Sequence, residues 1–257
     1  MTTTLRALAC ALVAAIALPA AAIDLRVLSA GAVEPGMRPA LAAFERESGH
    51  AVALAFAAAP ALREAVKAAP SADVIVVPEG LLDELVAGGR TVAGPRAPIG
   101  KVGVGVAVRS GVAAPDVSTA AALKTALVDA EVVVFNRAST GVWVEQVLQR
   151  LGVADAVAAK SERFADGASV MRRLLAGTAA RELGFGALTE IALFREQGIR
   201  LVGPLPAELQ NATAYVAVPW PGAASSDGAR TDAVAALVRH LQSPQARAQF
   251  VAAGIER

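Results

Sequence analysis

Residues 25–56, LRVLSAGAVEPGMRPALAAFERESGHAVALAF, contain the pattern that decides the fold. Met37, Leu41 and Phe44 are spaced i, i+4 and i+7, which places them on one face of a helix. Gly49 is suited to end that helix, because glycine readily adopts the left-handed conformation of a helix C-terminus. Two short apolar runs flank the helix and predict strands, residues 25–28 and 52–56. This order of strand, helix and strand is typical of a parallel sheet covered by helices.

The same alternation continues along the rest of the chain. Apolar or alternating runs predict further strands, residues 73–77, 102–108, 132–135, 183–186, 201–202 and 212–218. Amphipathic runs between them predict helices, residues 61–69, 81–87, 119–128, 141–151, 169–176, 188–196, 229–241 and 244–252. The alternation pauses and restarts near residue 100, which indicates two α/β units.

The end of the chain has helices but few strands of its own. We therefore expect the chain to cross from a first lobe to a second and to return, so that residues 23–100 and 213–257 form lobe I and residues 101–212 form lobe II. The fold class is α/β: two lobes, each a mostly parallel sheet flanked by helices, joined by two crossing strands around a cleft. One continuous sheet is the alternative.

The first 22 residues predict a secretory signal peptide. Arg6 gives a charged start, residues 7–18 are an unbroken apolar run, and Ala20-x-Ala22 supplies the small residues of a cleavage site. The run is shorter than the roughly 20 residues that span a bilayer. We therefore expect cleavage near Ala22 and a periplasmic protein. The only cysteine, Cys10, lies within this segment.

Composition and motifs exclude several function classes. The chain has 24 Lys and Arg against 23 Asp and Glu, its aromatic content is 4%, and its basic residues do not cluster, so nucleic acid is not an expected partner. His50 and His240 have no second ligand at metal-binding spacing, and we expect both at the solvated surface. There is no P-loop, G-x-S-x-G elbow or H-E-x-x-H motif. We therefore expect no enzyme activity, no metal and no cofactor.

Small residues fill the loops that follow several predicted strands. Ser29 and Gly31 follow the first strand, and residues 136–141 (NRASTG) follow a later one. In parallel sheets such loops gather at the carboxyl edge, where ligands bind. Helix N-termini there present free N–H groups that suit an oxyanion or a carboxylate. The alternative is that the Ser and Thr of NRASTG only cap their own helix.

Four stretches carry a resemblance to a known family: residues 25–56, residues 71–89 (SADVIVVPEGLLDELVAGG), residues 135–153 (FNRASTGVWVEQVLQRLGV) and residues 234–256 (VAALVRHLQSPQARAQFVAAGIE). In this order they resemble the periplasmic molybdate-binding proteins, a branch of the type II solute-binding proteins that serve ABC transporters. The resemblance implies the two-lobed periplasmic-binding-protein fold, a ligand captured between the lobes by a monomer, and delivery to a permease in the inner membrane.

The resemblance also implies a small anionic ligand, molybdate or tungstate, held by hydroxyls and backbone N–H groups. The two loop serines of the family fall here on Ala32 and Ala59, and its tyrosine falls on Ala187. Arg137 is a candidate replacement, because a guanidinium can pair with an anion through two hydrogen bonds; the alternative is a surface arginine. The predicted ligand-binding residues are Ser29, Gly31, Ala32, Ala59, Arg137, Ser139, Thr140, Gly141, Ser169 and Ala187.

The sequence therefore predicts a periplasmic solute-binding protein of an ABC importer that captures a molybdate-like oxyanion. A small organic carboxylate or another anion is the alternative ligand, because the side-chain donors of the family are replaced. A sensor module without a transport role and a secreted enzyme are the remaining alternatives. The enzyme alternative is disfavoured because the sequence shows no recognisable nucleophile or acid–base pair.

Overall fold

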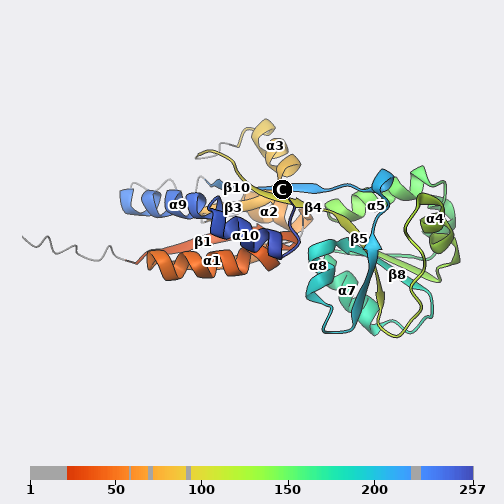
Figure 1. Cartoon of the computed structure of the whole chain (residues 1–257). Helices are drawn as coiled ribbons and strands as arrows, with labels where there is room; N and C mark the ends of the chain where they lie inside the picture. Colours follow the sequence, from red (N-terminus) through yellow and green to blue (C-terminus); the bar gives the residue numbers. More distant parts are fainter. Residues whose placement is uncertain (1–21, 58, 69–71, 91–93, 221–226, 257) are drawn as a thin grey trace, which may run out of the picture.

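The computed structural model of the chain describes residues 22–57, 59–68, 72–90, 94–220 and 227–256. Nearly all of the predicted signal peptide, including Cys10, therefore lies outside the described residues. The described part forms two lobes, each built on a five-stranded sheet with its own hydrophobic core (Figure 1). The predicted α/β class with two lobes is confirmed.

The first lobe contains a sheet with the strand order β2-β1-β3-β10-β4. Its strands are β1 (Asp24–Ala30), β2 (Ala51–Ala57), β3 (Val74–Pro78), β4 (Ala97–Val102) and β10 (Thr213–Pro219). The helices that flank it are α1 (Glu34–Ser48), α2 (Ala59–Ala68), α3 (Glu79–Ala87), α9 (Gly228–Leu241) and α10 (Pro244–Ala252). Strand β10 is antiparallel to both of its neighbours, so it runs against the other four strands.

The second lobe contains a sheet with the strand order β7-β6-β8-β5-β9. Its strands are β5 (Val104–Arg109), β6 (Val132–Asn136), β7 (Ser161–Phe164), β8 (Glu182–Ala187) and β9 (Ile199–Pro204). Its helices are α4 (Ala120–Asp129), α5 (Ser139–Arg150), α6 (Ala154–Ala158), α7 (Gly167–Ala176) and α8 (Leu188–Leu193). Here β5 runs against the other four strands, so each sheet is mostly parallel, as predicted.

Helix α1 follows from the sequence pattern that predicts it. Met37, Leu41 and Phe44 are buried in the first core. Gly49 has a φ of 73° and its N–H donates to the Glu45 carbonyl oxygen at 3.0 Å. A left-handed conformation at this position costs glycine little, and the helix therefore ends here.

Two crossings connect the lobes. β4 leads through Gly103 into β5, and the chain returns from β9 through the 3₁₀ helix η2 (Ala207–Leu209) to β10. The Val104 N–H donates to Gln210 Oε1 at 2.8 Å, and Gln210 Nε2 donates to the Val104 carbonyl oxygen at 2.9 Å. Trp143 Nε1 on α5 donates to the Leu209 carbonyl oxygen at 2.8 Å. The Val104–Gln210 bonds hold the second crossing beside the first. The Trp143 bond fastens the second crossing to α5 of the second lobe.

The C-terminal helices pack on the first lobe. The Arg230 guanidinium on α9 donates to both carboxylate oxygens of Asp73, at 2.8 and 2.7 Å. Lys101 and Glu256 exchange backbone hydrogen bonds of 2.6 and 2.8 Å, and Phe250 is buried in the first core. The tail thus completes the lobe in which the chain begins.

Four features differ from expectation. Strand β4 precedes the predicted strand 102–108 and was not predicted. Helix α6 and strand β7 were not predicted, since α6 is a five-residue helix and β7, SERF, carries no apolar alternation. The expected solvated position is wrong for His240, whose side chain is 9% exposed and whose Nε2 lies 3.0 Å from the Ala40 carbonyl oxygen.

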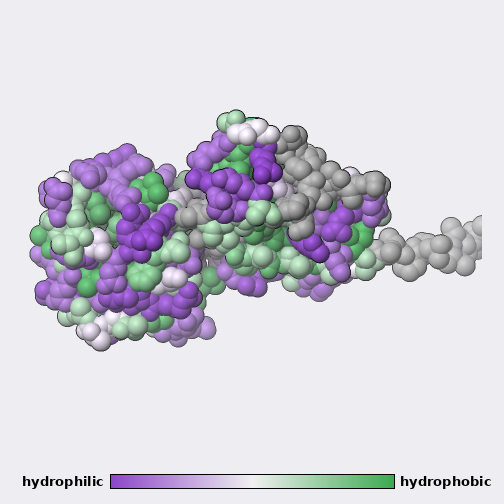
Figure 2. Space-filling view, turned by 180° about the vertical axis from the view of Figure 1, so that it is seen from behind, coloured by the Kyte–Doolittle hydropathy of each residue, from purple (hydrophilic) through white to green (hydrophobic). Residues whose placement is uncertain are grey.

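The space-filling view shows the two lobes as separate bulges with a narrow junction between them (Figure 2). Hydrophilic residues cover much of this face, and apolar residues are scattered among them (Figure 2). Within the described part of the chain, no helix combines the length and the apolar character that a membrane span requires.

Candidate functional site

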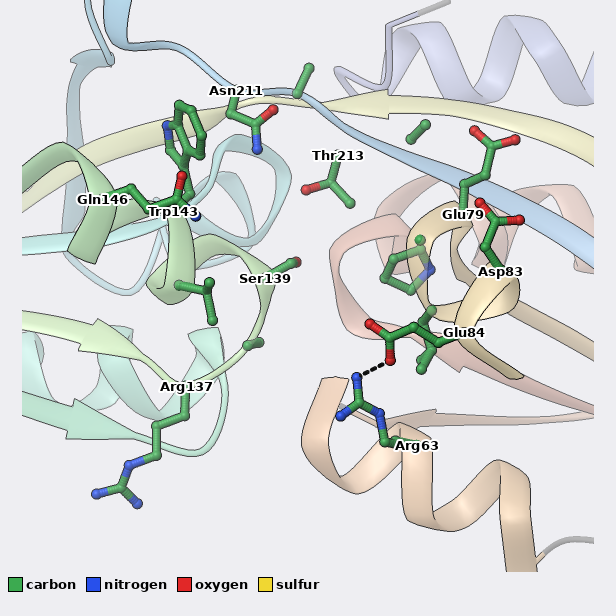
Figure 3. A pocket seen from close by; sticks show the side chains of 17 residues that line it. Arg63, Glu79, Asp83, Glu84, Arg137, Ser139, Trp143, Gln146, Asn211 and Thr213 are labelled. Carbon is green, nitrogen blue, oxygen red and sulfur yellow. Dashed lines mark hydrogen bonds and ion pairs between the residues drawn. The ribbon is translucent and has the colours of Figure 1, made fainter. Parts of the chain in front are cut away.

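The cleft between the lobes contains a wide cavity of about 650 Å³ (Figure 3). Helices α2 and α3 form its first-lobe wall, the start of α5 forms the opposite wall, and the crossing around Asn211 and Thr213 closes one side. Carboxylates of the first-lobe wall are paired with arginines: Glu84 pairs with Arg63 at 2.5 Å, and Asp83 pairs with Arg96 at 2.7 Å. These ion pairs balance the charge of both carboxylates.

A narrow cavity adjoins the wide one and shares Pro78, Ala138 and Ser139 with it. Its volume is about 20 Å³, close to the space that one water molecule needs. Both lobes line it: Ala30, Gly31, Ala32, Ala57, Leu62, Pro78 and Tyr215 belong to the first, and Asn136, Ala138, Ser139, Thr140, Gly167 and Glu190 to the second. A ligand larger than water therefore requires the lobes to separate around it.

Three helical segments begin at the narrow cavity: the 3₁₀ helix η1 (Gly31–Val33), α5 and α7. The first N–H groups of a helix have no acceptor within the helix. In the described part of the chain, the N–H groups of Ser139, Thr140 and Gly167 have no hydrogen-bond acceptor. They carry the partial positive charge of a helix N-terminus, which favours an anionic group beside them.

Asn136 and Gly141 build the start of α5. The Asn136 side chain is buried, and its Oδ1 accepts the N–H groups of Ala138 at 3.0 Å and Gly141 at 2.9 Å. A Cβ at Gly141 would overlap the Asn136 carbonyl group. Gly141 therefore shapes the loop, and its own N–H group is already bonded within the protein.

The structure brings four of the predicted ligand-binding residues together at the narrow cavity: Gly31, Ala32, Ser139 and Thr140. Ala59 is the first residue of α2. Arg137 lines the wide cavity only, is exposed, and extends away from the facing lobe (Figure 3). Its guanidinium has no ion-pair partner within the described residues.

Three further predicted residues lie behind the cavity wall. Ser29 is fully buried, and its hydroxyl donates to the Ala30 carbonyl oxygen at 3.2 Å. The Ser169 N–H donates to the Asp166 carboxylate at 2.7 Å, so this helix start is capped from within. Ala187 is buried and packs with the first core, although β8 belongs to the second sheet.

Glu190 was not among the predicted residues, yet it lines the narrow cavity. Its carboxyl accepts the Ala187 backbone N–H. Its Oε1 lies 3.3 Å from where a Cβ of Gly31 would stand, and a Cβ at Gly167 would overlap the carboxyl. Burial raises the pKa of Glu190 to about 7, and the carboxylates of Asp166 and Glu34 add to this rise against the opposing hydrogen bond. Near neutral pH the group therefore occurs both with and without its proton.

Tyr215 on β10 is the second functional group that the sequence did not reveal. It is 4% exposed and faces the same narrow cavity. Burial raises its pKa far above the usual value, the charge of Glu190 adds to this, and hydrogen bonds with the Ser139 and Thr213 side chains oppose it. The hydroxyl thus keeps its proton at neutral pH and can donate it in a hydrogen bond. As the only tyrosine of the chain, in a predicted crossing strand, it offered a signal.

The charge of the narrow cavity is set by Glu190 and by helix N-termini. None of the described residues that line it is a lysine or an arginine. No group of three His, Cys, Asp or Glu side chains in the described part is arranged to hold a metal ion. The arrangement can therefore hold an anion through N–H and O–H donors and can exchange a proton with it.

Known proteins resemble this chain in sequence and in fold. Residues 25–256 match the family of bacterial extracellular solute-binding proteins. A relative from Pseudomonas sp, named aconitate isomerase, is 31% identical over 240 residues, which are 90% of this chain and 87% of that protein.

Many solved structures share the fold, among them two with named ligands or sources. The periplasmic molybdate-binding protein of Azotobacter vinelandii is 19% identical, with a TM-score of 0.70 over 91% of this chain and 99% of the other. PEB3 bound to L-phospholactate is 13% identical, with a TM-score of 0.65 over 91% of this chain and 100% of the other; Peb3 comes from Campylobacter jejuni.

The family match extends from the first strand to the last residue of the C-terminal bridge. The solved structures have the same two-lobed architecture, and the predicted type II solute-binding fold is confirmed. The chain belongs to the bacterial extracellular solute-binding protein family.

Proposed function

We propose that this protein captures a small organic carboxylate in the cleft between its two lobes. The observation that carries the proposal is the 31% identity with an aconitate isomerase over 90% of the chain. The molybdate-binding structure is 19% identical, a level at which only the fold is shared. Aconitate is a small tricarboxylate with one carbon–carbon double bond.

The lining of the narrow cavity supports a ligand with a carbon skeleton. Ala32 stands where the resemblance to molybdate-binding proteins implies a serine, and the apolar side chains of Ala30, Ala57, Leu62 and Pro78 lie around it. Apolar walls with a few convergent polar groups are typical of sites for organic ligands. A bare tetrahedral oxyanion has no apolar surface to place against such a wall.

The polar groups of the cavity suit a carboxylate. The free N–H groups of Ser139, Thr140 and Gly167 can donate to one carboxylate of the ligand. The adjoining wide cavity, about 650 Å³, has room for the rest of a di- or tricarboxylate once the lobes separate. Trp143 and Gln146 on α5 offer an indole face and an amide there (Figure 3).

A molybdate- or tungstate-like oxyanion is the second candidate ligand. The narrow cavity offers N–H donors and is lined by no lysine or arginine among the described residues. The resemblance implies the same kind of uncharged site for the molybdate binders, which favours this candidate. The serine positions of that family are alanines here. Each missing hydrogen bond would weaken an oxyanion by about 0.5–1.5 kcal/mol.

We further propose that the protein is exported to the periplasm, loses its signal peptide near Ala22, and delivers its ligand as a monomer to an ABC permease. The charged, apolar and small-residue order of the first 22 residues supports the export. Membership of the extracellular solute-binding family supports the delivery. N-terminal sequencing of periplasmic material tests the cleavage, and recovery of intact Met1 from that fraction would contradict it.

Thermal melting with a panel of anions tests the ligand. The panel contains cis-aconitate, trans-aconitate, citrate, molybdate, tungstate and sulfate at equal ionic strength. A ligand at about 100 times its dissociation constant stabilises the folded protein by about 2.7 kcal/mol. We expect a rise in melting temperature with at least one tricarboxylate and none with sulfate. A rise with molybdate or tungstate and none with the carboxylates would instead establish the second candidate.

A further inference from the structure

The narrow cavity contains a titratable pair that anion binding does not require. Glu190 and Tyr215 line it from opposite lobes. An ionised carboxyl beside the ligand opposes the capture of an anion, because like charges repel, and Asp166 and Glu34 strengthen the negative potential there. A side chain that weakens binding and is nevertheless built into the site is a candidate for chemistry.

Several contacts fix the position of the Glu190 carboxyl. The Ala187 N–H holds it from the start of α8, and the glycines at positions 31 and 167 leave the space that it occupies. The neighbouring residue, Thr189, donates its hydroxyl to the Ala32 carbonyl oxygen at 2.5 Å across the two lobes. The first turn of α8 is thereby fastened to the first lobe beside the ligand-binding N–H groups.

We propose that Glu190 removes and returns a carbon-bound proton of the carboxylate captured in the cleft, while Tyr215 donates a hydrogen bond to the substrate carboxylate that gains negative charge. The inference rests on the proposed function, because that ligand is the substrate. It gives the cleft an activity in addition to binding: a 1,3-proton shift in an unsaturated carboxylate.

The step balances on aconitate without any further reactant. The CH₂ group of aconitate lies between a carboxylate and the double bond. Glu190 takes one of its protons, so a C–H bond breaks, an O–H bond forms, and the electron pair spreads over the allylic carbons and their carboxylates. The Glu190 carboxyl then delivers a proton to the far allylic carbon: the one it took, or one that it has exchanged with solvent in the meantime. The double bond has then moved, and rotation about the bond that was previously single sets the cis or trans configuration.

The two side chains have the states that these roles need. A pKa of about 7 for Glu190 leaves a useful fraction of the base ionised at neutral pH and still able to return its proton. Tyr215 stays protonated, so it acts as a hydrogen-bond donor and not as a base. The titratable groups that act on Glu190 from neighbouring elements are Asp166 and Glu34, and the charge of Glu190 acts in turn on Tyr215.

Hydrogen–deuterium exchange tests the inference. The purified protein is incubated with cis-aconitate in D₂O, and ¹H NMR follows the loss of the CH₂ signal and the appearance of trans-aconitate. Tricarballylate, the saturated counterpart, serves as a control ligand that binds without an allylic proton to lose. Calorimetry measures the dissociation constant of each ligand on the same preparations.

We expect exchange and isomerisation with the wild-type protein. Glu190→Gln should lower the exchange rate by about 100-fold or more, with cis-aconitate bound as tightly as before or more tightly, because the repulsion is gone. Tyr215→Phe should lower the rate by about 100-fold. Glu145→Gln on α5, whose partner is Arg163 outside both cavities, is the matched control and should keep the wild-type rate.

Each remaining outcome decides a question. Binding of cis-aconitate with neither exchange nor isomerisation overturns the inference and leaves the proposed function intact. An absence of binding overturns the proposed function itself. Wild-type exchange in Glu190→Gln removes Glu190 from the reaction. If that variant does not fold, Glu190→Asp replaces it, because aspartate withdraws the carboxyl by one methylene. A wild-type exchange rate in Glu190→Asp contradicts the inference. A lowered exchange rate with an unchanged dissociation constant supports it.

Discussion

The Thr189 hydroxyl donates to the carbonyl oxygen of Ala32 at 2.5 Å, and this bond joins the first turn of α8 in one lobe to η1 in the other. Thr189 is 1% exposed and Ala32 is 7% exposed. The bond therefore lies beside the narrow cavity and away from solvent, where it holds the two lobes together on the side on which Glu190 enters the cleft.

Thr189→Val removes this bond with little change in side-chain volume. We expect the free energy of unfolding to fall by about 1–3 kcal/mol, because the buried Ala32 carbonyl loses a donor. We also expect a larger radius of gyration by small-angle X-ray scattering, because the lobes lose a link. Thr125→Val on α4 is the control: its hydroxyl donates to the Ala121 carbonyl oxygen within the same helix, at an exposed position. Equal radii for all three proteins would show that this bond does not hold the lobes together.

Glu190 makes stability depend on pH in a defined direction. Its pKa rises from 4.5 to about 7 on folding, so the folded protein holds a proton that the unfolded chain releases between these values. The free energy of unfolding must therefore fall as the pH rises through this window and level off above it. Because the group is partly exposed, we expect a contribution of about 1–3 kcal/mol.

Glu190→Gln should remove that part of the fall and should be more stable than the wild type at pH 8. Urea unfolding at pH 5, 6, 7 and 8 measures both proteins. A wild-type curve that rises from pH 5 to pH 7, or two parallel curves, would contradict the raised pKa.

Asn136 and Arg137 are adjacent but should respond differently to substitution. Asn136→Ala leaves the N–H groups of Ala138 and Gly141 without their shared acceptor, so we expect a loss of about 1–3 kcal/mol in stability and weaker ligand binding. Arg137→Ala removes an exposed side chain that extends away from the facing lobe, and we expect the dissociation constant to change less than about two-fold. Calorimetry with the ligand found by melting compares them. Weaker binding in Arg137→Ala would return the guanidinium to the site.

The ion pair of Arg230 and Asp73 ties the C-terminal helices to the first lobe. Asp73 is 1% exposed and also accepts the Arg26 N–H at 2.7 Å. Arg230→Ala leaves this carboxylate buried with a single donor, so we expect a loss of about 2–3 kcal/mol in the free energy of unfolding. Lys67→Ala removes an exposed i,i+3 pair with Glu64 and should cost less than about 0.5 kcal/mol. Equal costs in denaturant would mean that the Arg230 pair contributes no more than a surface pair.

The fold could be predicted from the sequence because the residues that become buried recur in it with the spacing of a helix or a strand. Met37, Leu41 and Phe44 fall on one helical face, and Gly49 marks the end of that helix. The short edge strand β7 could not be predicted, because its four residues are all half-buried and carry no alternation. Its place in the sheet depends on pairing with β6, a contact between distant residues.

The candidate site was predictable where it consists of backbone. Gly31 and Ser139 follow strands and begin helices, so topology alone brings them to one edge. Glu190 and Tyr215 could not be found in that way. A glutamate in the first turn of a helix is ordinarily a solvated cap, and its meeting with Tyr215 depends on how the two lobes face each other. The expectation of no enzyme followed from the absence of a local motif. Glu190 and Tyr215 are 25 residues apart in the sequence and belong to different lobes, so no local motif could contain both.

Titration calorimetry of the purified protein with cis-aconitate, and separately with molybdate, tests the central claim most directly. We expect cis-aconitate or its trans isomer to bind with a stoichiometry of about one, and Asn136→Ala to weaken this binding, because the start of α5 presents the N–H groups that hold the ligand carboxylate. Molybdate should bind at least about ten-fold more weakly, since the hydroxyls that would hold it are replaced by alanine. Tight binding of molybdate with no heat from either aconitate isomer would contradict the account.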